Sequence, residues 1–472
     1  MSIAYSNVAA YGAITVAAVG LGAALQLYAR RRKVSVWTLS WPQLPTSLRV
    51  ALALVLLLHC YVAFFRLSKQ VEQAQVVHDI TRYSVDIEHY EDATLRIDRG
   101  EVPWRDFFFE YPPTAAYLVS VPGLGQGQLT RGIYTQRYIR YIGLLLALGT
   151  VLVGGLWLYY ARTAATGLAL ATWIYSVAFL GELTFLRMEP IIALLSLGGL
   201  SALFLISGER RSPVTFLVSG LLLGLAAAKL YPILLILPML PWIYARRGLT
   251  PFASGVFLTS LPSILPAILG LANTTKFLNY HGQRHMEIGS LYAVLNQFAA
   301  GGHTDLGFGS VQWRFDSENV VAKIATLLTL IATLFPLILI YWKRRDDRVA
   351  AYWAALASLS GFIFFNKVGS PQYVTWLLSA LVCGAILEMP SRALRGWLLS
   401  LFLVYLYAQG ANHQMANFTF DDGGRKALSA ITVKVTIEGL LYIAILATFF
   451  SSLRRDHQPK SESVPIPLEA TV

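Results

Sequence analysis

Apolar segments long enough to cross a membrane recur along almost the whole chain, separated by polar connections. A helix needs about 20 mainly apolar residues to span the hydrocarbon core of a bilayer. On this pattern the sequence predicts about 13 spans, at 8–29, 47–66, 139–161, 163–183, 189–207, 213–228, 231–245, 250–270, 322–342, 348–366, 372–389, 396–411 and 431–452. We therefore expect an all-α polytopic membrane protein, with a break at Lys229–Pro232.

Clusters of arginine and lysine occupy alternate connections between these spans. Such residues are enriched in cytoplasmic connections, which is the positive-inside rule. One orientation puts every cluster in the cytoplasm, with the N-terminus outside and the C-terminus inside. The clusters lie at 30–33, 162, 210–211, 246–247, 343–345, 392–395 and 454–455. The same orientation predicts two long outside loops, 67–138 and 271–321, and a shorter one near 411–430.

Composition agrees with a membrane protein and argues against soluble classes. Hydrophobic residues make up 56% of the 472 positions and charged residues 14%, against about 25% charged in soluble domains. The net charge of +12 is explained by the orienting clusters, so we expect no nucleic-acid partner. Cys60 and Cys383 lie inside apolar runs and predict neither a disulfide framework nor a metal site.

The pattern divides the chain into four predicted parts. Residues 1–46 hold an N-terminal span and a basic cytoplasmic loop, and residues 47–390 hold the main module with both long outside loops. Residues 391–453 add C-terminal spans. The polar segment 454–472 is expected to be a disordered cytoplasmic tail.

The first outside loop combines carboxylates with aromatic residues and prolines. Residues 76–98 have the pattern of an amphipathic helix on the membrane surface, with Asp86 and Tyr90 four positions apart on one face. Such a helix can hold a carboxylate over the mouth of the bundle. The alternative is that Asp86 is an ordinary solvated residue.

Charged residues also stand at the outer ends of later spans. They are Arg187, Glu189, Lys229, His281, Arg284, Glu287 and Lys367. A charge near membrane depth is costly and is therefore a functional candidate. The alternatives are side chains that snorkel to the interface and a simple pair between Arg187 and Glu189. Cations together suit a phosphate, and a carboxylate beside them suits a general base, so these residues suggest group transfer from a lipid phosphate.

Four segments resemble a known family, in order along the chain. They are Asp86…Tyr90…Gly100-Glu-Val-Pro-Trp-Arg-Asp-Phe…Glu-Tyr-Pro-Pro, Lys229-Leu-Tyr-Pro, Tyr280-His281-x-x-Arg284 and Lys367-Val-Gly-Ser-Pro-Gln-Tyr. They resemble glycosyltransferase family 87 of the GT-C superfamily, whose members are similar to polyprenol-phosphate-mannose-dependent α-mannosyltransferases. The resemblance covers about residues 45–390. Arg187-Met-Glu189 departs from the Arg-x-Asp that relatives often show, and 8–29 looks like an added span.

The resemblance implies a GT-C-like bundle and an inverting membrane glycosyltransferase with Asp86 as its catalytic aspartate. It also implies a polyprenyl-phosphate sugar donor, with mannose as the sugar, and a glycan or glycolipid acceptor on the extracytoplasmic side of the cell membrane. We expect Asp86 to act as the base, with Lys229, His281, Arg284 and Lys367 on the donor phosphate. The residues expected to contact the acceptor or shape the loop are Glu88, Tyr90, Arg105, Asp106, Glu110, Tyr111, Arg187, Glu189 and Gln372.

Two alternatives stay open from the sequence. Carboxylates at Asp86-Ile-Glu88 and Asp421-Asp422 are of the type that binds divalent metals, but the nearby cations can neutralise a phosphate, so we expect no cofactor. The rival function is a transporter or flippase of a lipid-linked sugar. Alternating access favours polar groups and broken helices near the middle of the bilayer, and only the break at Lys229 points that way.

Overall fold

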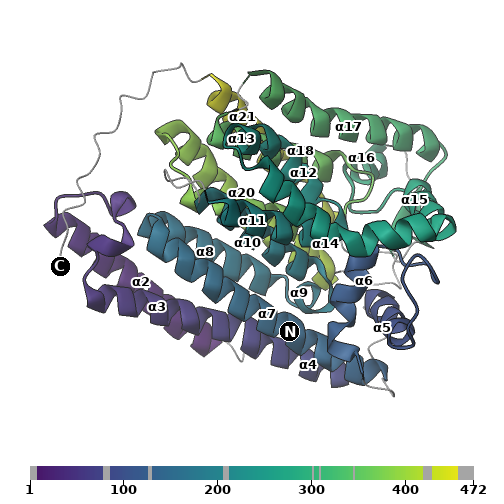
Figure 1. The fold of residues 1–472 in the computed structure, drawn as a ribbon, viewed down its shortest axis with the longest axis horizontal. Helices are drawn as coiled ribbons and strands as arrows, with labels where there is room; N and C mark the ends of the chain where they lie inside the picture. The colour runs from purple at the N-terminus through teal and green to yellow at the C-terminus, as the bar shows by residue number, and fades with distance from the viewer. Residues whose placement is uncertain are drawn as a thin grey trace.

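The computed structural model describes residues 8–77, 85–125, 130–205, 212–299, 302–307, 310–343, 346–417 and 428–454. In these parts the chain forms a bundle of helices with a short hairpin (Figure 1). Six of the described helices are long and apolar enough to cross a membrane: Thr46–Gln73, Arg131–Tyr160, Leu249–Leu269, Glu318–Lys343, Arg348–Phe365 and Leu428–Leu453. Shorter apolar helices stand between them. The helical class is confirmed, whereas the count of about 13 spans is not.

The N-terminal helices lie along one side of the bundle (Figure 1). Helix α2 (Val8–Arg31) packs against α3 (Thr46–Cys60), which passes through a π-helical turn into α4 (Leu67–Val77). The helix therefore runs beyond residue 66, into the segment predicted as an outside loop. The predicted helix over 76–98 is confirmed in its second part, α5 (Val85–Asp98), and residues 78–84 lie outside the described part of the chain.

The next helices carry the chain through the centre of the bundle. Helix α6 (Pro113–Ser120) begins at a proline, and α7 (Arg131–Tyr160) begins after Thr130, whose side chain accepts a bond from an amide of the first turn. Helices α8 (Thr163–Phe179), α9 (Glu182–Leu186) and α10 (Glu189–Leu205) follow. Arg187 takes an extended conformation between α9 and α10, which frees its side chain from both helices.

The predicted break around Lys229 is confirmed. Helix α11 (Pro213–Ala226) ends in the 3₁₀ turn η6 (Ala227–Lys229), and α12 (Pro232–Ile236) begins with its proline at the first helical position. Leu230 between them has a φ of +63°, a conformation that no α-helix contains. After η7 (Leu237–Met239), α13 (Leu240–Ala245) completes the segment.

The second predicted outside loop is folded rather than irregular. After α14 (Leu249–Leu269) it forms α15 (Leu271–Gln283), α16 (Leu291–Ala299) and the strands β1 (His303–Gly307) and β2 (Ser310–Arg314). The strands pair antiparallel, which the expectation of an all-α chain missed. Helix α17 (Glu318–Lys343) follows.

The C-terminal helices share the core of the main module. They are α18 (Arg348–Phe365), α19 (Tyr373–Val382), η8 (Cys383–Ile386), α20 (Ser391–Asn417) and α21 (Leu428–Leu453). One continuous group of buried side chains runs from Leu56 to Phe449. Residues 455–472, predicted as a tail, lie outside the described part.

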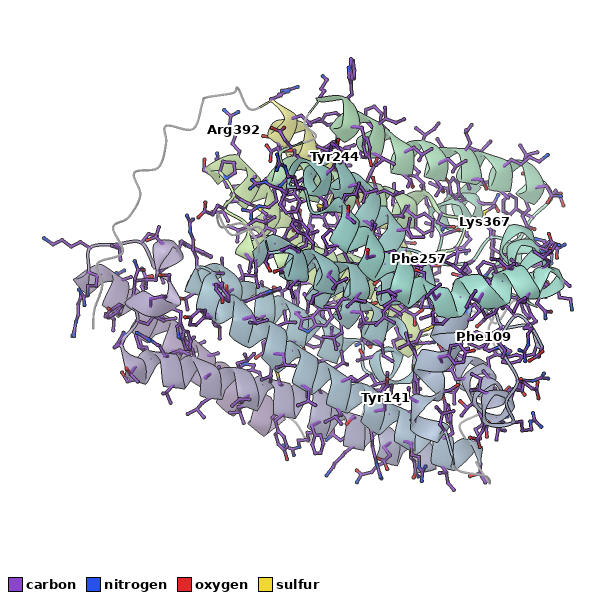
Figure 2. All side chains as sticks on the ribbon, viewed as in Figure 1. Phe109, Tyr141, Tyr244, Phe257, Lys367 and Arg392 are labelled. Carbon is purple, nitrogen blue, oxygen red and sulfur yellow. The ribbon has the colours of Figure 1, made fainter. Side chains whose placement is uncertain are left out.

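The segments that carry the predicted site gather at one end of the bundle. Helices α5, α6, α15 and α16 lie at the right-hand end in Figure 1. Lys367 and Phe109 are at the same end in Figure 2, whereas Arg392 of a predicted cytoplasmic cluster lies toward the other. The sequence likewise predicts that the basic clusters and the site residues lie at opposite ends of the spans.

Candidate active site

A cavity of about 610 Å³ lies among these helix ends and loops. Its polar lining comes from segments far apart in the chain: Asp86, His89, Glu110, Arg187, Lys229, Tyr280, Arg284, Glu287, Lys367, Gln372 and Gln414. Its apolar lining includes Leu183, Leu230, Ile233, Leu234, Phe277, Phe362 and Trp376. The structure thus brings the predicted carboxylate and most of the predicted cations to one hollow.

Asp86 is held in the wall of this cavity by the first turn of α5. Its side chain is buried, with the whole residue only 6% exposed, and it forms an ion pair with Arg187. The Tyr90 hydroxyl lies 3.5 Å from the carboxylate, as expected for residues four apart on one face. The alternative of a solvated Asp86 is therefore wrong.

Opposing effects act on the proton affinity of Asp86. Burial raises the pKa of the carboxyl, but the positive charges of Arg187 and Lys229 lower it, and the net shift is below the ordinary value. The carboxylate is therefore ionised at neutral pH. In that form it can accept a hydrogen bond, and then the proton, from a hydroxyl in the cavity.

Lys229 and Glu189 form a second buried ion pair beside the first. The Lys229 Nζ lies 2.6 Å from Glu189 Oε1, and the Glu189 side chain is fully buried. The same ammonium lies 3.9 Å from the centre of the Tyr111 ring, a cation–π contact. The expectation that Arg187 and Glu189 pair with each other is wrong, because each pairs with a residue from a distant segment.

Arg284 and Lys367 provide the positive charge on another part of the lining. Arg284 pairs with Glu287 at 2.8 Å, while its Nε is buried without a hydrogen-bond partner among the described residues. The Lys367 Nζ donates to the Gly282 carbonyl at 3.0 Å. Burial and the charge of Arg284 both lower the pKa of Lys367, so an anion between these side chains is electrostatically favoured.

Several predicted residues shape the first loop rather than line the cavity. Arg105 and Asp106 are exposed and pair with each other at 2.6 Å, and Asp106 also accepts a bond from the Val102 amide at 2.7 Å. Glu88 pairs with Arg131 at the start of α7. Arg105, Asp106 and Glu88 are not among the described residues that line the cavity.

Two residues of the first loop connect it to the rest of the site. Glu110 accepts a bond of 2.9 Å from the Tyr280 hydroxyl of α15, and both side chains line the cavity. The Trp104 carbonyl accepts a bond of 3.0 Å from the Asn273 side chain. The loop is thereby fastened to the junction of α14 and α15.

The side chains of three residues singled out from the sequence lie outside the described part of the chain, and some residues of the site were not predicted. His281 lies in α15, but its side chain is outside the described part, as are Asp421 and Asp422. Gln414 of α20 and Ser310 of β2 line the cavity and were not predicted. The sequence does contain a signal for Gln414, because this polar residue stands at the end of an apolar span.

The carboxylates that could bind a divalent metal were one alternative left open by the sequence. Among the described residues, no group of three or more histidine, cysteine, aspartate or glutamate side chains is placed to hold a metal ion. Asp86 and Glu88, suggested as a ligand pair, instead bind arginines on different elements.

Comparison with known proteins leaves the family open. No protein-family model and no curated protein matches this chain. The resemblance to glycosyltransferase family 87 therefore remains a prediction.

Proposed function

We propose that this protein is an inverting membrane glycosyltransferase. It takes a sugar, mannose by the family resemblance, from a polyprenyl-phosphate donor and transfers it to a hydroxyl of a glycan or glycolipid. The observation that carries the proposal is that the buried, ionised Asp86 shares one cavity with Arg284 and Lys367. A base and a phosphate-binding group are the two elements that such a transfer requires.

In the proposed reaction, Asp86 accepts the proton of the acceptor hydroxyl. The hydroxyl oxygen then forms a bond to the anomeric carbon, on the face opposite the phosphate. The bond between that carbon and the phosphate oxygen breaks, and its electron pair leaves with the polyprenyl phosphate. Attack from the opposite face inverts the anomeric configuration.

The cations suit the negative charge that develops on the leaving phosphate. Arg284 retains a buried Nε–H without a partner among the described residues, and Lys367 adds a point charge close to it. Lys229 is less available, because Glu189 and the Tyr111 ring already surround it. We therefore assign the phosphate chiefly to Arg284 and Lys367 and give Lys229 an electrostatic role at Asp86.

The apolar part of the cavity suits the isoprenoid chain of the donor. Leu230 and Ile233 line the cavity and are also among the exposed large apolar side chains, at 45% and 38%. Leu230 stands between η6 and α12, and Ile233 is in the first turn of α12. An isoprenoid chain that leaves the cavity past these two side chains would contact apolar surface.

The rival function, movement of a lipid-linked sugar across the membrane, has weaker support. The structure contains the break at Lys229, but the charged lining residues stand at or between helix ends, and Lys367 among them lies at one end of the bundle in Figure 2. A site at one end supports chemistry there rather than alternating access. The proposal puts that end on the extracytoplasmic side of the cell membrane, following the basic clusters.

The proposal can be tested by mass spectrometry of glycans and glycolipids. Cells lacking the protein should lose a hexose from at least one of them, and the wild-type gene should restore it. Asp86→Asn should not restore it, because losing a general base costs at least about 100-fold in turnover. Asp106→Asn is the matched control from the same loop and should restore it.

Two results would overturn the proposal. One is full complementation by Asp86→Asn at an expression level where turnover limits the product. The other is an unchanged set of glycans together with an accumulated lipid-linked sugar on the cytoplasmic face, which would favour the transporter.

A further inference from the structure

Lys434 is a buried cation in α21, a helix outside the segments that suggested the site. Its side chain is 0% exposed. The ammonium donates to the Gly369 carbonyl at 2.9 Å and to the Gly289 carbonyl at 3.2 Å, and it lies 2.9 Å from Glu438 Oε1. An ammonium has three protons, and these three acceptors use all of them.

The two carbonyls belong to segments that cross at the cavity. A Cβ atom added at Gly289 would clash with the Gly369 carbonyl, and one added at Gly369 would clash with Gly289. The crossing therefore depends on both residues being glycine. The amide of Glu287 also donates to the Lys367 carbonyl at 3.0 Å, so the segments are bonded beside the crossing as well.

These segments carry the side chains of the proposed phosphate site. Arg284 and Glu287 stand just before Gly289, and Lys367 stands just before Gly369. All of them line the cavity. Whatever holds the two glycine carbonyls together therefore helps to set the separation of Arg284 and Lys367.

We propose that Lys434 is a positioning residue that holds this wall of the cavity in its binding geometry from the C-terminal helix. It does not contact the ligand, because it is wholly buried and has no free proton. The nature of the ligand rests on the function proposed above, whereas the positioning itself does not. Helix α21 then contributes to the geometry of the site through Lys434.

A double substitution separates positioning from simple loss of charge balance. Lys434→Met alone would leave Glu438, which is 6% exposed, without its cation. Lys434→Met with Glu438→Leu removes both charges, and replacing a buried pair by apolar residues is often tolerated. Thr448→Val is the matched control, since Thr448 is buried in the same helix about four turns away.

Hydrogen–deuterium exchange of the detergent-solubilised full chain tests positioning without any ligand. In the double variant, peptides covering 284–291 and 366–373 should exchange roughly tenfold faster, while peptides from α7 and α10 keep their wild-type rates. The Thr448→Val control should leave both segments unchanged. Unchanged exchange in the double variant would overturn the proposal.

A binding measurement with decaprenyl phosphate tests the consequence for the site. The double variant should bind it at least about tenfold more weakly, because charged hydrogen bonds to the phosphate lengthen, and should bind decaprenol like wild type. In a protein that already carries Arg284→Gln, the double substitution should reduce the affinity for decaprenyl phosphate by a smaller factor. The reason is that Arg284→Gln and the double substitution weaken the same contact with the phosphate. Faster exchange with unchanged phosphate affinity would overturn the link to the ligand. Faster exchange in a protein whose wild type does not bind decaprenyl phosphate would support positioning and count against the proposed function.

Discussion

Asp86 in the first turn of α5 forms an ion pair with Arg187, which stands in the extended turn before α10. The neighbouring residue of the same turn region, Glu189, pairs instead with Lys229. Two ion pairs thus tie three distant segments together at the cavity. The pairing keeps Asp86 ionised although it is buried, because the charges of Arg187 and Lys229 outweigh burial.

Removing Arg187 should move the acidic limb of the pH–rate profile. In the wild type the pKa of Asp86 is below its ordinary value of about 3.9, so kcat/KM should stay level down to about pH 4 and fall as Asp86 gains its proton below it. Arg187→Met removes the main charge that offsets burial, so the pKa of Asp86 should rise and the limb should move to higher pH. The profile of kcat/KM against pH measures this, with Arg105→Met as the exposed control. An acidic limb that stays in place in Arg187→Met would mean that another group controls it.

The lowered pKa of Asp86 also predicts how the stability of the fold depends on pH. A carboxyl whose folded pKa is below its unfolded pKa stabilises the fold above the unfolded value, and this contribution is lost as pH falls through the folded pKa. Thermal unfolding of the wild type should therefore move to lower temperature below about pH 4. Asp86→Asn should flatten that part of the curve, whereas Asp106→Asn changes an exposed carboxyl and tests how specific the effect is.

Arg284 should be required for recognition of phosphate but not of the lipid chain. Arg284→Gln combined with Glu287→Gln removes the charged fork without leaving Glu287 unpaired. Binding of decaprenyl phosphate should weaken by roughly 1.5–3 kcal/mol, the value of a charged hydrogen bond. Decaprenol should bind the variant and the wild type alike. Calorimetry or fluorescence titration in detergent measures both, and wild-type affinity for the phosphorylated lipid would make the Arg284 cluster purely structural.

Lys229 should matter strongly for stability because its partner cannot reach water. Lys229→Met leaves the fully buried Glu189 without a cation and should cost about 3–5 kcal/mol. Adding Glu189→Gln should recover most of this loss. The exposed pair of Arg105 and Asp106 is the control, since Arg105→Met should cost only about 0–1 kcal/mol. Chemical unfolding in detergent compares the variants, and equal losses from the Lys229 and Arg105 changes would contradict the expectation.

The predicted orientation can be checked by cysteine labelling of intact cells. After Cys60→Ala and Cys383→Ala, single cysteines replace the exposed Lys276, Ser317 or Ser391. An impermeant thiol reagent should label the first two and spare the third, because Lys276 and Ser317 lie in the second predicted outside loop. If the cysteine at position 391 is labelled and the cysteines at positions 276 and 317 are not, the orientation is the reverse of the predicted one. The basis for an extracytoplasmic site would then be removed.

Much of the secondary structure and several site residues were predictable from local pattern. The apolar runs predicted most helices, and the alternation of the basic clusters predicted the break at Lys229–Pro232. The cost of charge near the membrane singled out Arg187, Arg284 and Lys367, all of which line the cavity. The hairpin β1–β2 was missed because its strands are short and bounded by ordinary loop residues.

The sequence by itself determined which segments are helical and which polar residues interrupt them, since both follow from the local cost of exposing apolar surface and burying charge. It did not determine which charges meet. Only the tertiary structure decided that Asp86 pairs with Arg187, that Lys229 pairs with Glu189, and that Lys434 reaches the carbonyls of Gly289 and Gly369. The physical reason is that an ion pair depends on the distance between two side chains, and for distant segments the packing of the helices sets that distance.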